Sequence, residues 1–196
     1  MKTEYTASRL TPYPVVLDSC VIFPMYLRDT LFRAAENGLY DVYWSQEILE
    51  GATRNLVNTG RMTRERAARF EAALKEAFPD AMVEVLDDLI VQMTNDPGDR
   101  HVVAAAVVAK AQVIVTSNLR DFPPKSLNPW GIVALHPDVF LNRLYEVAPD
   151  LMANLIWQQA EDLKNPPLTV EKLLVRLREE VPVFADKIQR YYDNIS

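Results

Sequence analysis

Cysteine is almost absent from this chain of 196 residues, and it contains no long apolar run, internal repeat or low-complexity segment. The single cysteine, Cys20, cannot form an internal disulfide framework. No apolar stretch is long enough to cross a bilayer, and the first residues show no basic start followed by an apolar run. These absences exclude disulfide-stabilised and membrane-spanning classes, so we expect a globular protein in the cytoplasm with no membrane partner.

Basic residues are the minority charge. The chain has 21 Lys and Arg against 27 Asp and Glu, which gives a formal net charge of −6 at pH 7. This charge opposes binding to nucleic acid by the molecule as a whole, although bound metal would neutralise some acids and a local basic patch can still attract phosphates. One basic stretch covers residues 61–75, and its simplest interpretation is a solvated helix face with Arg/Glu pairs.

Strand-like and helix-like segments alternate over the first two thirds of the chain. A helix after Pro24 should end at Gly38, because glycine readily adopts the left-handed conformation found just past helix ends. Ser45 should cap a second helix, and Pro79 should stop the helix that begins near Thr63. Strands are expected at residues 15–17, 41–44, 82–86, 113–117 and 132–135. This alternation predicts an α/β fold with a mostly parallel central sheet and helices on both faces.

The pattern changes at His136, after which no strand is expected. Three or four short helices, separated by prolines, fill the remainder. Their apolar residues recur at helical spacing, which favours packing within the protein over an exposed partner surface. We therefore predict two units, a sheet domain over residues 1–135 and a helical C-terminal extension over residues 136–196.

Four acidic residues stand where apolar elements begin or end. Asp18 closes the apolar run PVVL, and Asp121 follows the run VIVTSN. Glu50 lies in an expected helix, and Asp99 opens the run HVVAAAVV. Because sites in parallel sheets gather beyond the C-terminal ends of the strands, all four can face one crevice. Several carboxylates in one place need a positive charge to relieve their repulsion, and oxygen ligands suit Mg²⁺ or Mn²⁺.

Each acid also has a structural explanation. Asp18 and Asp121 could form turns, and Asp99 could cap the helix that follows it. Glu47, on the same helix, competes with Glu50 for the role of second acid. A metal site is the better interpretation for the set as a whole, because burying unpaired carboxylates is costly.

Three segments, in order, carry a resemblance to a known family: VVLDSCVIF, SQEILEGATRNLV and DPGDRHVVAAAVVAKAQVIVTSNLRDFP. Their order and spacing resemble the PIN domain, the fold of VapC-type toxin ribonucleases, in a branch with a C-terminal helical extension. The resemblance covers residues 15–124, and its second half, with a D-x-x-D-R-H-V turn and a T-x-N-x-x-D-F ending, is the specific part. It implies a PIN-like α/β/α sandwich and a Mg²⁺- or Mn²⁺-dependent endoribonuclease that cleaves single-stranded RNA. It also implies the toxin of a type II toxin–antitoxin system, with a cognate antitoxin and commonly a homodimer.

The resemblance assigns roles to individual residues as well. It implies that four acids are catalytic and bind the metal: Asp18, Glu50, Asp99 and Asp121. Asn118 would be a polar neighbour of the metal, and Ser19 and Ser117 would flank the site. One departure from the family pattern is Gly51, which follows Glu50 where relatives usually carry an apolar residue.

Other polar residues lie near these motifs. Asp96 is expected mainly to shape its loop, with contact to the metal through water as a second role. Three basic residues border the expected crevice and would contact substrate phosphates, unless they pair with the acids: Arg100, Arg120 and Lys125. His101 is expected to be structural, and Cys20 to be a small inert apolar residue.

The chemistry expected at such a site is metal-assisted attack on a phosphodiester. Two cations about 3.5–4 Å apart would activate a water and stabilise the leaving oxygen, whereas a single cation would orient one hydroxide. An aspartyl-phosphate enzyme is disfavoured, because it needs an Asp two positions after the nucleophile, where this chain has Cys20. The remaining alternative is a catalytically idle PIN-like module that binds RNA or protein, in which one or more acids would be expected to be missing.

Overall fold

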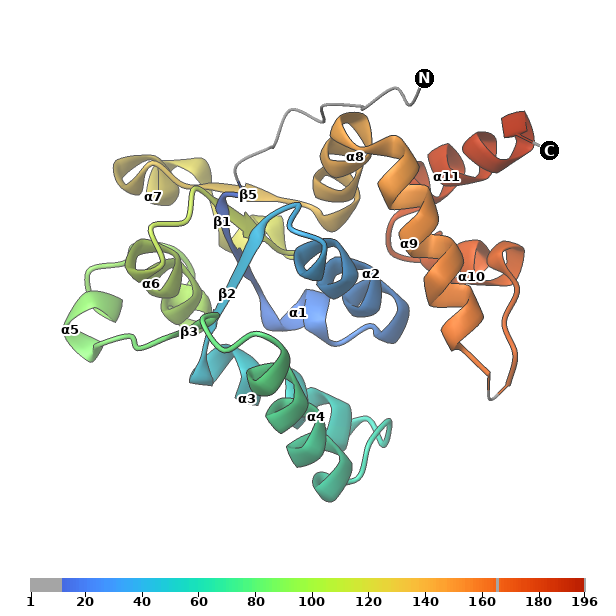
Figure 1. Cartoon of the computed structure of the whole chain (residues 1–196). Helices are drawn as coiled ribbons and strands as arrows, with labels where there is room; N and C mark the ends of the chain where they lie inside the picture. The colour runs from blue at the N-terminus through green and yellow to red at the C-terminus, as the bar shows by residue number, and fades with distance from the viewer. Residues whose placement is uncertain (1–11, 165, 196) are drawn as a thin grey trace.

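The sheet at the centre of the protein is parallel throughout its five strands. A computed structural model describes residues 12–164 and 166–195 (Figure 1). The strand order is β3-β2-β1-β4-β5, and each neighbouring pair is parallel. The strands are β1 (Pro14–Leu17), β2 (Asp41–Ser45), β3 (Met82–Val83), β4 (Val113–Val115) and β5 (Val133–Leu135). This sheet confirms the predicted α/β fold.

Helices connect the strands and cover the sheet. Those that precede β5 are α1 (Ser19–Ile22), α2 (Met25–Glu36), α3 (Gln46–Asn58), α4 (Arg64–Ala77), α5 (Asp87–Ile90), α6 (Arg100–Val108) and α7 (Pro124–Leu127). Short 3-10 turns occur at η1 (Pro97–Asp99), η2 (Leu119–Asp121) and η3 (Asn128–Trp130). The Ala/Val-rich helix α6 packs across β1, β2 and β4, which explains why it has almost no polar side.

The predicted helix boundaries are confirmed. Gly38 has a φ of +73° just after α2, as the end of a helix requires. The Ser45 hydroxyl accepts a hydrogen bond from the N–H of Ile48 at 3.3 Å, and Thr63 caps α4 in the same way through Arg66. These caps begin α3 directly after β2 and α4 after the turn that follows α3, and the two helices pack against each other.

The strand expected at residues 82–86 is shorter than predicted. The short helix α1 was not predicted, and neither were two short helices later in the chain. Only Met82 and Val83 pair with β2, after which the chain turns into α5. The second of these later helices, α7, lies between the last two strands and begins with Pro124. Within the described part of the chain, no helix is long and apolar enough to span a membrane.

After β5 the chain forms four helices, α8 (Pro137–Val147), α9 (Pro149–Asp162), α10 (Val170–Leu177) and α11 (Pro182–Ile195). Figure 1 shows them gathered on one side of the sheet, next to α2. Thr30 of α2 donates to Gln159 of α9 at 2.7 Å, and both side chains are fully buried. Tyr40 meets Phe140 edge to face at 5.0 Å between ring centres. The C-terminal helices therefore share the core of the sheet domain.

Candidate active site

Asp18 lies where β1 ends and α1 begins, and only 4% of its surface is exposed. Its backbone N–H donates to the carbonyl of Val115 on β4 at 3.1 Å. Oδ2 accepts hydrogen bonds from the Thr116 hydroxyl at 2.7 Å and from the Cys20 thiol at 3.1 Å, and Oδ1 accepts from the Ser19 hydroxyl at 3.3 Å. Although Asp18 stands at the N-cap of α1, its side chain makes no cap bond. Neighbouring side chains hold the carboxylate, and Oδ1 is its less constrained oxygen.

Thr116 belongs to this site, although we did not single it out from the sequence. Its side chain is fully buried, donates to Asp18 and accepts from the N–H of Asn118 at 3.0 Å. Since Leu17 pairs with Val115 in the parallel ladder, the residues that follow them meet at the edge of the sheet. The signal in the sequence was a hydroxyl residue directly after an apolar strand, at the start of TSN.

The Cys20 thiol fills the space between these groups. Its Sγ lies 3.4 Å from Oγ1 of Thr116 and accepts from the N–H of Ser117 at 3.3 Å. Burial, followed by the neighbouring charge of Asp18, raises the pKa of Cys20 to about 12, so the thiol keeps its proton at neutral pH. Such a thiol is a poor nucleophile, as expected, but it makes polar contacts that we had not expected.

Asp99 stands between η1 and α6, and its side chain makes no cap bond to α6. Its pKa is raised to about 6, first by partial burial and then by the charges of three nearby carboxylates: Asp18, Asp121 and Asp96. A hydrogen bond to Asp121 raises the pKa further by favouring the protonated form. Four aspartates from three segments of the chain therefore lie close enough to repel one another.

Asp121, in η2, connects two of these segments. Its carboxylate accepts a hydrogen bond from the side-chain amide of Asn118 and lies 3.3 Å from Nε of Arg120. Its backbone carbonyl accepts from the N–H of Asp96 at 3.3 Å. Asp96 in turn accepts from the N–H of Gly98 at 2.9 Å, the loop-shaping contact predicted for it. The two loops are thus joined through their backbones at the acidic cluster.

The two candidates for the second acid point in different directions. Glu50 accepts a hydrogen bond from Gln46 at 2.9 Å and lines a groove between α3 and α4. Glu47 lies 3.7 Å from Nδ1 of His101, in the first turn of α6, and 57% of its side chain is exposed. Glu50 is thus turned toward α4, whereas Glu47 is turned toward the helix that Asp99 precedes.

Gly51 shows which side of α3 faces the turn that carries Asp18. A Cβ atom at Gly51 would lie only 3.2 Å from Cβ of Ser19, so glycine permits this close approach of α3. At roughly 100° per residue, Glu47 lies about 40° from Gly51 around the helix axis, and Glu50 lies about 100° away. Helix geometry therefore favours Glu47 over Glu50 as the acid nearer the cluster.

The remaining predicted residues border the cluster in different ways. Arg100 is half-buried, and its Nε lies 3.5 Å from the carbonyl of Asn95. Arg120 is highly exposed apart from its contact with Asp121. Lys125 is exposed on α7, and Ser117 is exposed beside β4. Arg120 and Lys125 are therefore the predicted cations that solvent reaches most easily.

The donor set has the chemistry of a hard-cation site, but the side chains are not yet arranged as ligands. Within residues 12–164 and 166–195, no three Asp, Glu, His or Cys side chains surround a common point at coordination distance. The raised pKa of Asp99 follows from its partial burial and the charges of the neighbouring carboxylates, and within the cluster Arg120 pairs with Asp121. A divalent cation would fit this set, with rotation of the partly exposed side chains toward it.

Comparison with known proteins agrees with this geometry. The family model described as the PIN domain matches residues 14–120, which is more than half of the chain. The chain belongs to the PIN domain family. A second model, described as the VapC50 C-terminal domain, matches residues 137–190, which hold α8 to α10 and most of α11.

The sequence of the chain is also similar to that of an individual protein. The chain is 43% identical over 106 residues to a Mycobacterium tuberculosis protein named "Putative ribonuclease VapC50". The aligned part is 54% of this chain and 63% of that protein, so the match spans less than two thirds of the relative. No solved structure matches the chain.

Proposed function

We propose that this PIN domain protein is a metal-dependent endoribonuclease that cleaves single-stranded RNA. The observation that carries the proposal is the crowding of Asp99 by Asp18, Asp121 and Asp96 at the C-terminal edge of a parallel sheet. A fold that holds carboxylates this close, with one exposed arginine paired to Asp121, is suited to bind a hard divalent ion. The named activity of the relative from Mycobacterium tuberculosis supports the same chemistry.

Within this proposal Asp18, Asp99 and Asp121 hold Mg²⁺ or Mn²⁺, and Glu47 or Glu50 adds a fourth acid. The bound cation would supply Lewis-acid activation of a water and stabilisation of the leaving oxygen. Thr116 and Cys20 keep Oδ2 of Asp18 in place and leave Oδ1 as the oxygen with fewer contacts. Asn118 orients Asp121 through its side-chain amide, and Ser19 contributes the remaining contact to Asp18.

The surroundings of the cluster support a substrate that approaches from the loop side. We assign Arg120 and Lys125 to contacts with RNA phosphates because both are exposed beside the loops that carry the acids. Arg100 is held closer to the backbone and would act by fixing its loop.

We further propose that the protein is the cytoplasmic toxin of a type II system, held inactive by a cognate antitoxin, and that it forms a homodimer. The division into a nuclease domain (1–135) and a helical extension (136–196) belongs to the same proposal.

The direct test is incubation of the purified protein with single-stranded RNA and Mn²⁺, followed by mapping of the cleaved ends. We expect cleavage by the unsubstituted protein that chelator abolishes, and loss of at least a hundredfold in rate for Asp18→Asn. Asp80→Asn, an exposed carboxylate of the turn after α4, is the matched control and should retain full activity. Cleavage that survives in Asp18→Asn would identify a contaminating nuclease. Mn²⁺ that stabilises the unsubstituted protein and Asp18→Asn equally would favour the idle-module alternative.

A further inference from the structure

Arg61 is an arginine whose position is fixed although its side chain is exposed. It follows Gly60, which has a φ of +69° at the end of α3, and its N–H donates to the carbonyl of Leu56 at 3.0 Å. Its guanidinium lies 4.4 Å from the centre of the Phe23 ring, a cation–π contact. None of the salt bridges found among the described residues involves Arg61. The group is thus held in place by the Phe23 ring and its backbone contact, without a direct ion pair.

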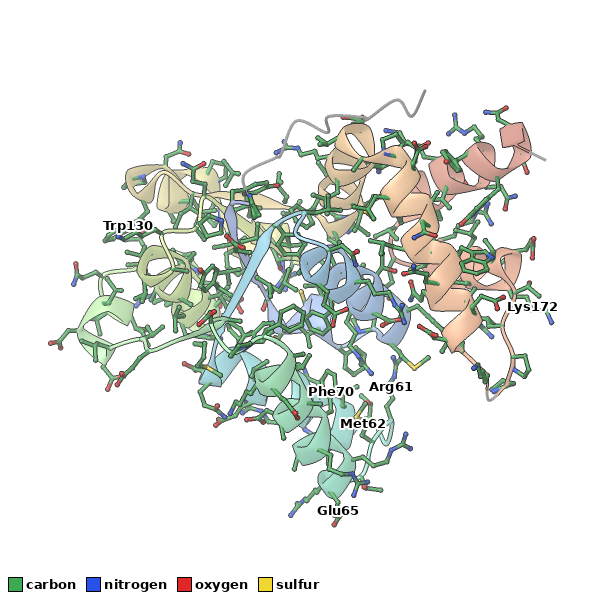
Figure 2. All side chains as sticks on the ribbon, in the orientation of Figure 1. Arg61, Met62, Glu65, Phe70, Trp130 and Lys172 are labelled. Atoms are coloured by element: carbon green, nitrogen blue, oxygen red, sulfur yellow. The ribbon has the colours of Figure 1, made fainter. Side chains whose placement is uncertain are left out.

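A second guanidinium lies close to the first. Arg28 of α2 is buried, donates to the carbonyls of Ile22 and Phe23, and lies over the ring of Phe70. Burial lowers the pKa of Arg28, Asp29 opposes this effect, and the charge of Arg61 lowers the pKa further. The two cations therefore repel each other. Figure 2 shows Arg61 and Phe70 together in the space between α4 and the C-terminal helices.

The C-terminal extension closes the other side of this space. A pocket of about 240 Å³ lies between the first turn of α2, Arg61 and the end of α10, where Arg176 is exposed. Glu179 and Glu180 also line it, and Glu179 lies 3.6 Å from Arg176. That pair is largely exposed and is worth little, so an incoming phosphate can replace Glu179 at small cost. Tyr26 and Met25 form the pocket wall on α2.

The position of the arginines relative to Asp18 suggests what they bind. Helix α1 begins directly after Asp18 and ends at Ile22, next to Phe23. Five residues of helix span about 7.5 Å, so Arg61 lies on the order of 10 Å from Asp18. A separation of this size would place Arg61 within a few nucleotides of a bond cleaved at the acidic cluster. Arginines beside aromatic rings are a common surface for single-stranded nucleic acid.

We propose that Arg61, supported by Arg28 and joined by Arg176 of α10, binds a backbone phosphate of the RNA within a few nucleotides of the cleaved bond. The inference rests on the proposed ribonuclease function. It gives the helical extension a direct part in substrate binding, since α10 supplies one side of the phosphate site. The occupant is an RNA backbone, because an unpaired guanidinium stands on an aromatic ring here and the site adjoins the acidic cluster through α1.

The test measures binding separately from cleavage. A fluorescent single-stranded RNA of about 12 nucleotides is titrated with Asp18→Asn protein, in which cleavage is blocked, at several salt concentrations. We expect Arg61→Ala to weaken binding about tenfold and to reduce the slope of log K against log salt by about 0.7, the value for one phosphate contact on a single strand. Arg66→Ala is the matched control, an exposed arginine of α4 without a ring beneath it, and should change binding less than twofold.

Further variants distinguish the possible outcomes. Arg61→Lys should bind with intermediate affinity, because it keeps the charge and loses the planar contact with Phe23. Arg176→Ala should weaken binding about threefold if α10 takes part. Equal effects of Arg61→Ala and Arg66→Ala, with RNA still bound and cleaved, would refute this inference alone and assign the arginines to a protein partner. Absence of both RNA binding and cleavage in the parent proteins would refute the proposed function and this inference with it.

Discussion

Replacing Asp99 by Asn should stabilise the protein when no metal is present. The folded protein raises the pKa of Asp99 from 3.8 to about 6, so the fold disfavours the charged form. A group of this kind contributes its stability at low pH, and that contribution is lost as the pH rises from about 4 through 6. At pH 7.5 the carboxylate is charged and crowded, and an amide of the same shape removes the repulsion.

The size of the effect follows from the change in pKa. A difference of about two pH units corresponds to about 3 kcal/mol at 1.36 kcal/mol per unit. Because Asp99 is only partly buried, water screens part of the repulsion, and we expect about 1 kcal/mol of stabilisation. For a chain of this length, that is a rise in Tm of about 2–4 °C. The gain should be much smaller near pH 4, where Asp99 carries its proton in the folded chain and the pH lies close to its pKa of 3.8 in the unfolded chain.

Thermal unfolding in chelator, at pH 4 and pH 7.5, measures this difference. Addition of Mn²⁺ at 100 times its Kd should stabilise the unsubstituted protein by about 2.7 kcal/mol at pH 7.5, and Asp99→Asn by much less. Asp99→Asn should therefore have the higher Tm in chelator, and the unsubstituted protein should have the higher Tm when metal is added. Asp80→Asn, which lies away from the cluster, should match the unsubstituted protein under every condition. If Asp99→Asn lowers the Tm in chelator equally at both pH values, the carboxylate is a structural element and the reasoning is wrong.

Two further predictions concern the groups around the cluster. Thr116→Val removes the hydroxyl that donates to Asp18 at 2.7 Å, so we expect a rate of RNA cleavage about tenfold lower and a higher Mn²⁺ requirement, measured by metal titration of initial rates. Thr116→Ser should restore both, and an unchanged metal requirement in Thr116→Val would show that the hydroxyl does not position Asp18. Glu47→Gln should reduce cleavage at least tenfold, whereas Glu50→Gln should reduce it less than threefold, because only Glu47 lies on the side of α3 that faces the Asp18 turn. The opposite ranking would establish Glu50 as the second acid.

The sequence predicted the sheet and most helices well, because their signals are local. Ser45, Thr63 and Gly38 act within one turn of the helix that each begins or ends. The helices α1, α5 and α7 were not predicted, because each has four residues and is too short for a periodic pattern. The strand at Met82 was predicted too long, since its pairing depends on where β2 ends and not on its own residues.

The residues of the site were harder to predict where the answer depends on which side of a helix faces the site. Glu47 and Glu50 have the same chemistry and lie three residues apart, so the sequence alone cannot tell which faces Asp18. The close approach of Gly51 to Ser19 supplies that direction, and it depends on the packing of α3 against α1. Thr116 could be assigned to the site only once the register of the strands was known, because the pairing of β1 with β4 places it beside Asp18.

The burial of Arg28 could not be predicted from the sequence pattern either. The helical pattern placed the apolar side of α2 against the core, and an arginine on that side contradicts the pattern. Its burial is possible because the carbonyls of Ile22 and Phe23, at the end of the short helix α1, accept its hydrogen bonds. A sequence pattern cannot show carbonyl groups left free by the end of a neighbouring helix.

The two ends of α1 lie beside clusters of opposite charge. Near Asp18, the carboxylates of Asp121 and Asp96 join it in raising the pKa of Asp99, and at the other end the charge of Arg61 lowers the pKa of Arg28. Each cluster lowers the stability of the free protein, so both are better explained by a ligand that completes them than by folding. An RNA backbone accompanied by a divalent cation carries both charges needed, the cation for the carboxylates and a phosphate for the arginines. One ligand thus relieves both repulsions, and α1 sets the distance between the cleaved bond and the bound phosphate.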